Sequence, residues 1–347
     1  MNYKFLGRNT GLPIGEFALG TAMFGETWDY ATQTKEAGRI IDLFVEHGGN
    51  LLDTADTYQS GESEVVLGKV IGSKRNDLVI TTKFTRGVLQ GQGLGSLGNH
   101  RKNMVQSVEA SLKRLNTDRI DLFFVHQDDF FTPMEEIVRG LDDLVRAGKI
   151  VYGGLSNFPA WRVSSSSTMA DLRGWSAIAA IEVEYSLLQR DTERELLPMA
   201  DALGLGVLAW SPLAGGLLTG KYRKGESGRA TLIPGGIPYH AESTTDALLD
   251  ELFSVADSID SKPELVAIAW LREKGVVPVL GVRTFEQLEN NLKVSEVKLT
   301  SEHMQKLDDA GAFKLGYPHD FNASVENRDV LTGGKGDRIQ KPNHIVG

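Results

Sequence analysis

Apolar and polar residues alternate along the chain with two different periods. Short runs of aliphatic and β-branched residues are separated by longer segments in which apolar residues recur at every third or fourth position. The first pattern is typical of buried strands, and the second of amphipathic helices. The predicted strands are Phe17–Gly20, Asn50–Asp53, Leu78–Thr82, Ile120–Val125, Ile150–Leu155, Ala179–Glu184, Val207–Trp210 and Val276–Leu280.

Helical segments lie between these predicted strands. They are Thr34–His47, Asn103–Leu115, Pro133–Ala147, Pro159–Leu172, Glu193–Leu203, Pro263–Lys274 and Phe285–Leu292. The alternation predicts an α/β fold, and eight strands are the number needed for a closed (β/α)8 TIM barrel. An open doubly wound sheet is the alternative that the same pattern allows.

The barrel prediction treats residues 1–347 as a single domain with long loops at its C-terminal face. The segment Lys4–Ile14 predicts an N-terminal hairpin that caps the barrel floor. Lys221–Ser243 is rich in glycine and proline, and predicts a long loop after the seventh strand. Residues 313–347 are polar and glycine-rich, which predicts an irregular tail or a flap over a pocket.

Composition and charge exclude several classes of function. The formal net charge is −9 without a basic stripe, so nucleic acid is not an expected partner. The absence of cysteine rules out disulfides, thiolate metal sites and thiol nucleophiles, and we predict no metal site. No signal peptide is visible, and the apolar stretch Gly204–Gly220 is short for a membrane span. We therefore expect a cytoplasmic protein without a membrane partner, and the oligomeric state stays open.

Four chemically active residues stand where predicted strands give way to loops. Asp53, Lys83 and His126 end the second, third and fourth strands, and Tyr58 lies in the loop after Asp53. In a barrel these ends converge on one pocket. Each residue alone has an ordinary structural explanation, but a phenol held near an ammonium can exchange a proton more readily than an isolated tyrosine. The four together predict an enzyme of carbonyl and alcohol chemistry.

One glycine motif points to a different class of site. Gly93–Gly98 matches the G-x-G-x-x-G fingerprint of dinucleotide-binding folds. That fingerprint follows a strand directly, whereas the segment Phe84–Gln92 separates it from the third predicted strand. We interpret the motif as a glycine loop over the barrel mouth.

The active residues belong to a series of motifs that resembles the aldo-keto reductase family. The matching segments are Gly20–Gly25, Leu52–Tyr58, Thr81–Lys83, Asp121–His126, Gly153–Asn157, Glu184–Ser186, Ala209–Leu213 and Gly281–Arg283. The resemblance runs from about Phe5 to Ala310, nearly the whole chain. It implies a barrel that binds NADP(H) without a Rossmann domain and reduces a small-molecule aldehyde or ketone.

The resemblance also assigns catalytic roles. Tyr58 is expected to protonate the carbonyl oxygen while hydride arrives at the carbonyl carbon. Lys83, paired with Asp53, is expected to favour the phenolate and so lower the cost of giving up that proton. His126 is expected to donate a hydrogen bond to the same oxygen.

The cofactor implied by the resemblance is NADPH or NADP+, with NADH as the alternative. Ser156 and Asn157 are expected to hold the nicotinamide carboxamide, Trp210 to stack on the ring, and Arg283 to contact the 2′-phosphate. The full set of expected cofactor-binding residues is Gly20, Thr21, Ala22, Asp53, Ser156, Asn157, Glu182, Trp210, Ser211, Pro212, Leu213, Gly215, Gly216, Leu217, Lys221, Gly281, Arg283, Gln287, Asn290 and Asn291.

The chain departs from the family pattern at two cofactor positions. Glu182 stands where the family usually has glutamine, and Asn290 where many relatives have glutamate. An ionised glutamate can accept a hydrogen bond from the carboxamide but cannot donate one. Either nicotinamide affinity is reduced, or Glu182 is held protonated.

The substrate is less well specified than the cofactor. An aromatic-lined pocket is predicted from Phe24, Trp28, Phe84, Gln127, Phe158 and Trp161, any of which could instead serve in ordinary packing. Two other functions remain open. One is an NAD(P)-dependent dehydrogenase of sugars or other alcohols, and the other is a redox-sensing regulatory binding subunit.

Overall fold

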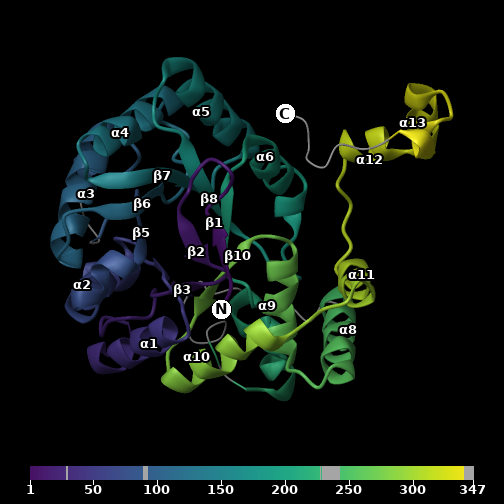
Figure 1. Cartoon of the computed structure of the whole chain (residues 1–347), viewed down its shortest axis with the longest axis horizontal. Coiled ribbons are helices and arrows are strands. Elements are labelled where there is room, and N and C mark those ends of the chain that lie inside the picture. Colours follow the sequence, from purple (N-terminus) through teal and green to yellow (C-terminus); the bar gives the residue numbers. More distant parts are fainter. Residues whose placement is uncertain (29, 89–92, 227, 229–242, 340–347) are drawn as a thin grey trace.

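The protein folds as a closed barrel of eight parallel strands, which confirms the predicted (β/α)8 architecture (Figure 1). The computed structural model describes residues 1–28, 30–88, 93–226, 228 and 243–339. Around the barrel the strands follow the order β10-β3-β4-β5-β6-β7-β8-β9, so the last strand pairs with the first. Their bounds are β3 (Ala18–Gly20), β4 (Leu51–Asp53), β5 (Val79–Phe84), β6 (Ile120–Val125), β7 (Ile150–Ser156), β8 (Ile178–Glu184), β9 (Gly206–Trp210) and β10 (Val277–Gly281).

A ring of helices covers the outside of the barrel (Figure 1). Seven occur where the sequence pattern predicts them: α1 (Thr34–Glu46), α3 (Arg101–Leu115), α4 (Met134–Arg146), α5 (Ala160–Arg173), α6 (Leu196–Leu203), α9 (Pro263–Glu273) and α10 (Phe285–Leu292). The pattern missed α2 (Glu62–Val70), α8 (Ser243–Ser258) and α11 (Ser301–Ala310). Helix α2 lacks a clear apolar stripe, because its buried face includes Ser63 and Glu64 as well as aliphatic residues.

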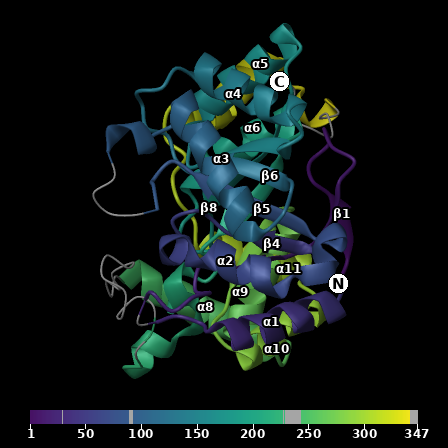
Figure 2. The same ribbon diagram turned by 90° about the vertical axis from the view of Figure 1, so that its left-hand side faces the viewer.

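The predicted hairpin closes the N-terminal end of the barrel. Strands β1 (Tyr3–Phe5) and β2 (Pro13–Gly15) pair antiparallel at that end (Figure 2). The hairpin residues Leu6 and Ile14 are buried in one apolar cluster with Leu51, Val79 and Val277, which begin their strands. The barrel interior is therefore packed at the floor, which leaves the opposite, C-terminal rim for a site.

The C-terminal tail is partly helical and extends away from the barrel. Its helices α12 (His319–Ala323) and α13 (Val325–Thr332) lie apart from the ring (Figure 1, yellow). Arg194 donates to the Leu315 carbonyl at 2.6 Å, which fastens the start of the tail near α6. Of the predicted long loop, residues 221–224 form a helical turn, and most of the rest lies outside the described residues. No helix in the described parts of the chain is long and apolar enough to cross a membrane.

A glycine in β7 marks where the barrel wall has no spare room. A Cβ atom on Gly154 would lie 2.5 Å from a ring carbon of Phe124 and 3.0 Å from the Ala180 carbonyl oxygen. Since overpacking a well-filled interior costs roughly 1–3 kcal/mol, we expect Gly154→Ala to lower the free energy of unfolding by that amount. Urea denaturation measures it. Gly11→Ala is the matched control, because no heavy atom lies within 4 Å of its added Cβ. Equal midpoints for both variants would show that the wall can relax around the methyl group.

Candidate active site

A cavity of about 760 Å³ lies at the carboxyl ends of the barrel strands. This is the rim at which a barrel gathers residues that are distant in sequence. Strand-end residues from seven different strands line it: Gly20, Asp53, His126, Ser156, Glu182, Trp210 and Gly281. The cavity thus collects most of the residues that the motifs singled out.

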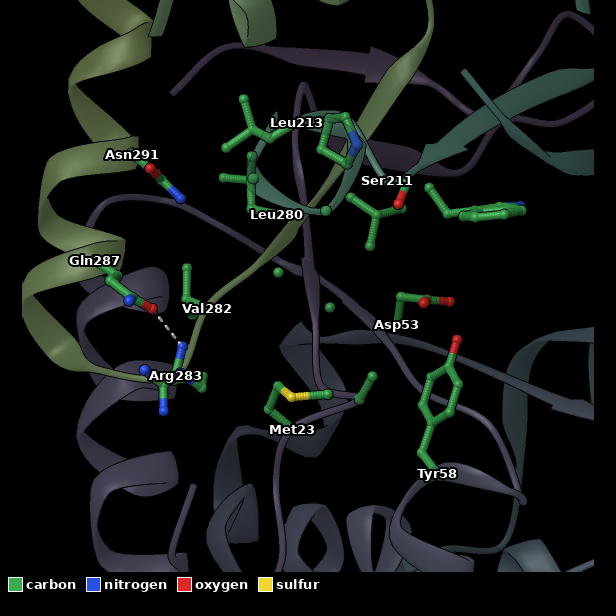
Figure 3. Close-up of a pocket in the computed structure, with 18 of the residues that line it drawn as sticks. Met23, Asp53, Tyr58, Ser211, Leu213, Leu280, Val282, Arg283, Gln287 and Asn291 are labelled. Carbon is green, nitrogen blue, oxygen red and sulfur yellow. Dashed lines mark hydrogen bonds between the residues drawn. The ribbon is translucent and has the colours of Figure 1, made fainter. Parts of the chain in front are cut away.

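The four predicted catalytic residues meet at one end of this cavity. Lys83 is fully buried below the surface of the cavity, with its ammonium 2.6 Å from Asp53 Oδ1 and 3.0 Å from the Thr54 carbonyl oxygen. The same ammonium lies 5.3 Å from the centre of the Tyr58 ring. The rings of Tyr58 and His126 meet edge to face with centroids 6.0 Å apart. The Tyr58 hydroxyl points toward Asp53 (Figure 3).

A strained turn holds Tyr58 at the cavity. Directly after it, Gln59 and Ser60 adopt left-handed backbone conformations, with φ of 51° and 57°. Such conformations cost energy in residues other than glycine and persist where their surroundings fix them. Gln59 is fully buried, and its side-chain oxygen accepts a hydrogen bond from the Trp28 backbone N–H at 2.8 Å. The turn therefore fixes Tyr58 and Trp28 relative to each other.

Burial keeps both Tyr58 and His126 electrically neutral. Burial raises the pKa of Tyr58 to about 12, although the nearby Lys83 ammonium acts in the opposite direction. Lys83 thus favours the phenolate as predicted, but dehydration of the phenol outweighs it. Burial, with Lys83 and Arg86, lowers the pKa of His126 to about 3. At neutral pH the site therefore presents a protonated phenol and a neutral imidazole.

A second carboxyl group shares the Lys83 ammonium. Glu182 is buried, its Oε1 lies 3.2 Å from Lys83 Nζ, and its Oε2 has no hydrogen-bond partner among the described residues. Burial and the neighbouring Asp53 charge raise the pKa of Glu182 above its usual range, and Lys83 opposes them only in part. Burial disfavours the charge on Lys83, but the two carboxyl groups outweigh it and raise the pKa of Lys83. The sequence left open whether Glu182 is ionised, with reduced nicotinamide affinity, or protonated. Its burial and its neighbours favour the protonated form.

The residues expected around the nicotinamide form one hydrogen-bonded network. The Asn157 amide nitrogen donates to the His126 carbonyl at 2.9 Å and to Ser156 Oγ at 3.0 Å. Its amide oxygen accepts a hydrogen bond from the Trp210 indole at 3.1 Å. Asn157 therefore sets the positions of Ser156 and Trp210 on either side of it. A flat ring with an amide substituent suits this wall, because it offers both an aromatic face and polar groups.

The opposite end of the cavity is polar, with Arg283, Gln287 and Asn291 (Figure 3), and its charged lining residues include Lys262, Glu264 and Glu286. Thr284 caps α10, and the Gln287 side chain accepts a hydrogen bond from the Arg283 backbone N–H at 2.8 Å. The Arg283 guanidinium lies 3.3 Å from the centre of the Tyr30 ring, and its buried Nε has no partner among the described residues. Lys262, on a different loop, donates to Asn290 at 2.6 Å. These cations suit the phosphates of a dinucleotide.

Between the two ends, a turn after β9 exposes backbone to the cavity. Gly215 and Gly216 have left-handed φ angles of 66° and 94°. A Cβ on Gly216 would lie 2.9 Å from Lys221 Cε, so a larger residue would crowd the lysine. Such a turn permits close approach of a pyrophosphate to backbone N–H groups. The residues present therefore fit a nicotinamide dinucleotide along the length of the cavity.

Several predicted site residues do not reach the cavity. Thr21 is buried and donates to the Asp53 carbonyl at 3.0 Å, and Leu217 packs in the main core. Three predicted pocket residues, Phe24, Phe84 and Phe158, are buried in that core between strands and helices. Trp161 is 68% exposed and does not line the cavity. The positions of the three phenylalanines agree with the packing explanation, whereas Trp161 lies at the surface, and Trp28 and Gln127 line the cavity.

Some lining residues were missed by the sequence reasoning. They are Met23, Tyr30, Thr57, Arg86, Thr219, Lys262, Glu264, Ile268, Val279, Leu280, Val282 and Glu286. Tyr30 and Arg86 lie in loops that follow recognised motifs, so their positions in the sequence could have identified them as lining residues. Lys262 precedes α9, far from any motif, and only the folded chain brings it to Asn290.

Comparison with known proteins is consistent with this geometry. The sequence model of the aldo/keto reductase family matches residues 16–312. The chain is 35% identical to the uncharacterized oxidoreductase YrpG of Bacillus subtilis, over 89% of this chain and 95% of that protein. It is 33% identical to the norsolorinic acid reductase of Aspergillus flavus, over 92% of this chain and 83% of that protein. It is 32% identical to an aryl-alcohol dehydrogenase of Phanerodontia chrysosporium with NADP(+) in its name, over 91% of this chain and 88% of that protein.

The family match covers most of the chain and includes all eight strands of the barrel. It therefore confirms the resemblance that the motifs first indicated. The chain belongs to the aldo/keto reductase family of oxidoreductases.

Proposed function

We propose that the protein is an NADPH-dependent reductase that converts aldehydes or ketones to alcohols. The observation that carries the proposal is the neutral Tyr58 held between the Lys83 ammonium and the His126 ring. A buried tyrosine that keeps its proton at neutral pH can donate it to a carbonyl oxygen as hydride reaches the carbon. The names of the norsolorinic acid reductase and aryl-alcohol dehydrogenase relatives agree with this chemistry.

Each residue of the site has its own role in the proposed reaction. When it is bound, the nicotinamide supplies the hydride. Tyr58 gives the proton from its hydroxyl oxygen, and the Lys83 ammonium stabilises the phenolate that remains. His126, as a neutral imidazole, donates a hydrogen bond to the carbonyl oxygen, where negative charge develops. Ser156 and Asn157 orient the carboxamide, and Trp210 covers one face of the ring.

The substrate is proposed from the rim of the cavity. Trp28 lines it, is fixed beside the turn that holds Tyr58, and offers an aromatic face. Aromatic rings pair favourably with such faces. Aromatic aldehydes and ketones are therefore the first substrates to test, with aryl alcohols and NADP+ for the reverse reaction. Steady-state oxidation of NADPH or NADH by the purified protein tests the proposal, and a lack of turnover with every class would contradict it.

Removal of the Tyr58 hydroxyl separates proton donation from cofactor binding. We expect Tyr58→Phe to bind NADPH as the wild type does but to lose roughly 10²–10⁴-fold in kcat, because general acid catalysis contributes about that much. Single-turnover kinetics and fluorescence titration measure the two quantities. Tyr317→Phe is the control, since Tyr317 is 86% exposed in the tail. Near-normal kcat in Tyr58→Phe would assign the acid to another group.

Arg283 should decide the preference between the two cofactors. Only NADPH carries the 2′-phosphate, and a charge-assisted hydrogen bond contributes about 1.5–3 kcal/mol. Arg283→Ala should therefore weaken NADPH by roughly 10–150-fold and NADH much less. Arg39→Ala is the matched control, because Arg39 also stacks on an aromatic ring, that of Phe285, but does not line the cavity. An equal loss for NADPH and NADH in Arg283→Ala would give Arg283 a structural role.

A further inference from the structure

Glu182 is a buried acid that the proposed reaction does not use. Its side chain is 2% exposed and lines the cavity. One carboxyl oxygen lies 3.2 Å from the Lys83 ammonium, and the other has no partner among the described residues. A buried polar atom without a partner is costly, and it is most easily explained by a ligand or by a proton.

The charges around Glu182 do not balance when every group is ionised. Asp53 and Glu182 would carry two negative charges, and the ammonium of Lys83 supplies one positive charge between them. The other groups that face this cluster, Tyr58 from the turn after β4 and His126 from the end of β6, are neutral. One proton on the pair of carboxyl groups therefore neutralises the cluster.

Hydrogen bonding decides which carboxyl group holds that proton. Asp53 Oδ1 accepts hydrogen bonds from Thr81 at 2.5 Å and from Lys83 at 2.6 Å, which stabilise its ionised form. Glu182 has a longer contact with Lys83, and a hydrogen bond between the Glu182 and Asp53 carboxyl groups raises the pKa of Glu182. The proton therefore resides on Glu182 when no other positive charge is near.

Bound cofactor would change this balance. Glu182 pairs in register with Ser156, and its carbonyl accepts a hydrogen bond from the Asn157 backbone N–H at 3.1 Å. In the proposed function these two residues hold the carboxamide, so the carboxyl group of Glu182 lies beside the nicotinamide. The oxidised ring carries a positive charge that the reduced ring lacks. A positive charge beside Glu182 favours its ionised form.

We propose that Glu182 binds a proton in step with the redox state of the nicotinamide, holding it beside NADPH and releasing it beside NADP+. The inference rests on the proposed function. In the reduction, hydride passes to the carbonyl carbon and Tyr58 gives its proton to the carbonyl oxygen. Glu182 then passes its proton through the Lys83 ammonium to the Tyr58 phenolate. Tyr58 is restored, the Glu182 carboxylate faces the positive ring, and Glu182 regains a proton from water when NADP+ leaves.

The ratio of cofactor affinities tests the inference. The dissociation constants of NADPH and NADP+ are measured by fluorescence titration from about pH 6 to pH 9, where a carboxyl group with a raised pKa titrates. Both cofactors carry the 2′-phosphate, so its ionisation cancels in the ratio. In the wild type, NADP+ should tighten relative to NADPH as pH rises, by up to about tenfold per pH unit. In Glu182→Gln the ratio should be independent of pH.

A matched variant identifies the titrating group. Burial, with the nearby Glu64 charge, raises the pKa of Asp56 to about 7, so Asp56 also titrates in this range. Asp56 does not line the cavity, and Asp56→Asn should therefore keep the pH dependence of the wild-type ratio. The inference would be overturned if the ratio of the two dissociation constants did not change with pH in the wild type. It would also be overturned if the ratio changed equally with pH in Glu182→Gln.

Proton release gives a second measurement that needs no variant. In weakly buffered solution near neutral pH, NADP+ binding to the wild type should release more protons than NADPH binding does, with a difference of up to about one per site. Equal proton release for both cofactors would overturn the inference while leaving the proposed function intact. Failure of the wild type to bind either cofactor would instead overturn the proposed function, and the inference with it.

Discussion

Closure of the barrel is the constraint on which the site depends. β10 pairs with β3 in parallel, with Val279 opposite Ala18, so every strand of the barrel has a neighbour on both sides and the barrel has no edge. Because all eight strands run in the same direction, their carboxyl ends form one rim. The register then fixes which residues become neighbours there, as for Gly20 opposite Asp53. Chemistry at this rim is therefore a property of the closed barrel rather than of any local segment.

Within the rim, the Lys83 ammonium governs the charge state of its surroundings. It holds Asp53 at 2.6 Å and Glu182 at 3.2 Å, and its charge acts on the pKa of Tyr58 and of His126. Such a buried cation is tolerable only because carboxyl groups surround it. In the proposed mechanism, the same arrangement ties proton donation at Tyr58 to the protonation of Glu182, although these two residues lie far apart in the sequence.

Much of the fold was accessible from the sequence because buried strands and one-sided helices leave strong periodic patterns. Helix α2 was missed since Glu64, which reads as a surface residue, is buried against Arg114 at 2.6 Å. At the site, most residues within motifs line the cavity, but Thr21 is buried beside it, and Phe84, assigned to the pocket, stacks on Phe123 in the core. Sequence alone does not say which side of a strand end an aromatic ring will face. It also gave no sign that Tyr30 would lie against Arg283, because that contact joins opposite ends of the chain.

The buried charges also affect how variants of this protein should be judged. The dehydration of Lys83 and Asp53 opposes folding, and attraction between buried ions often fails to offset it. Apolar residues of similar volume at these positions would tend to stabilise the barrel while abolishing its chemistry. A screen that ranks variants by melting temperature or expression level would then reward inactive proteins. In the proposed function, the charged centre serves turnover and not thermal resistance.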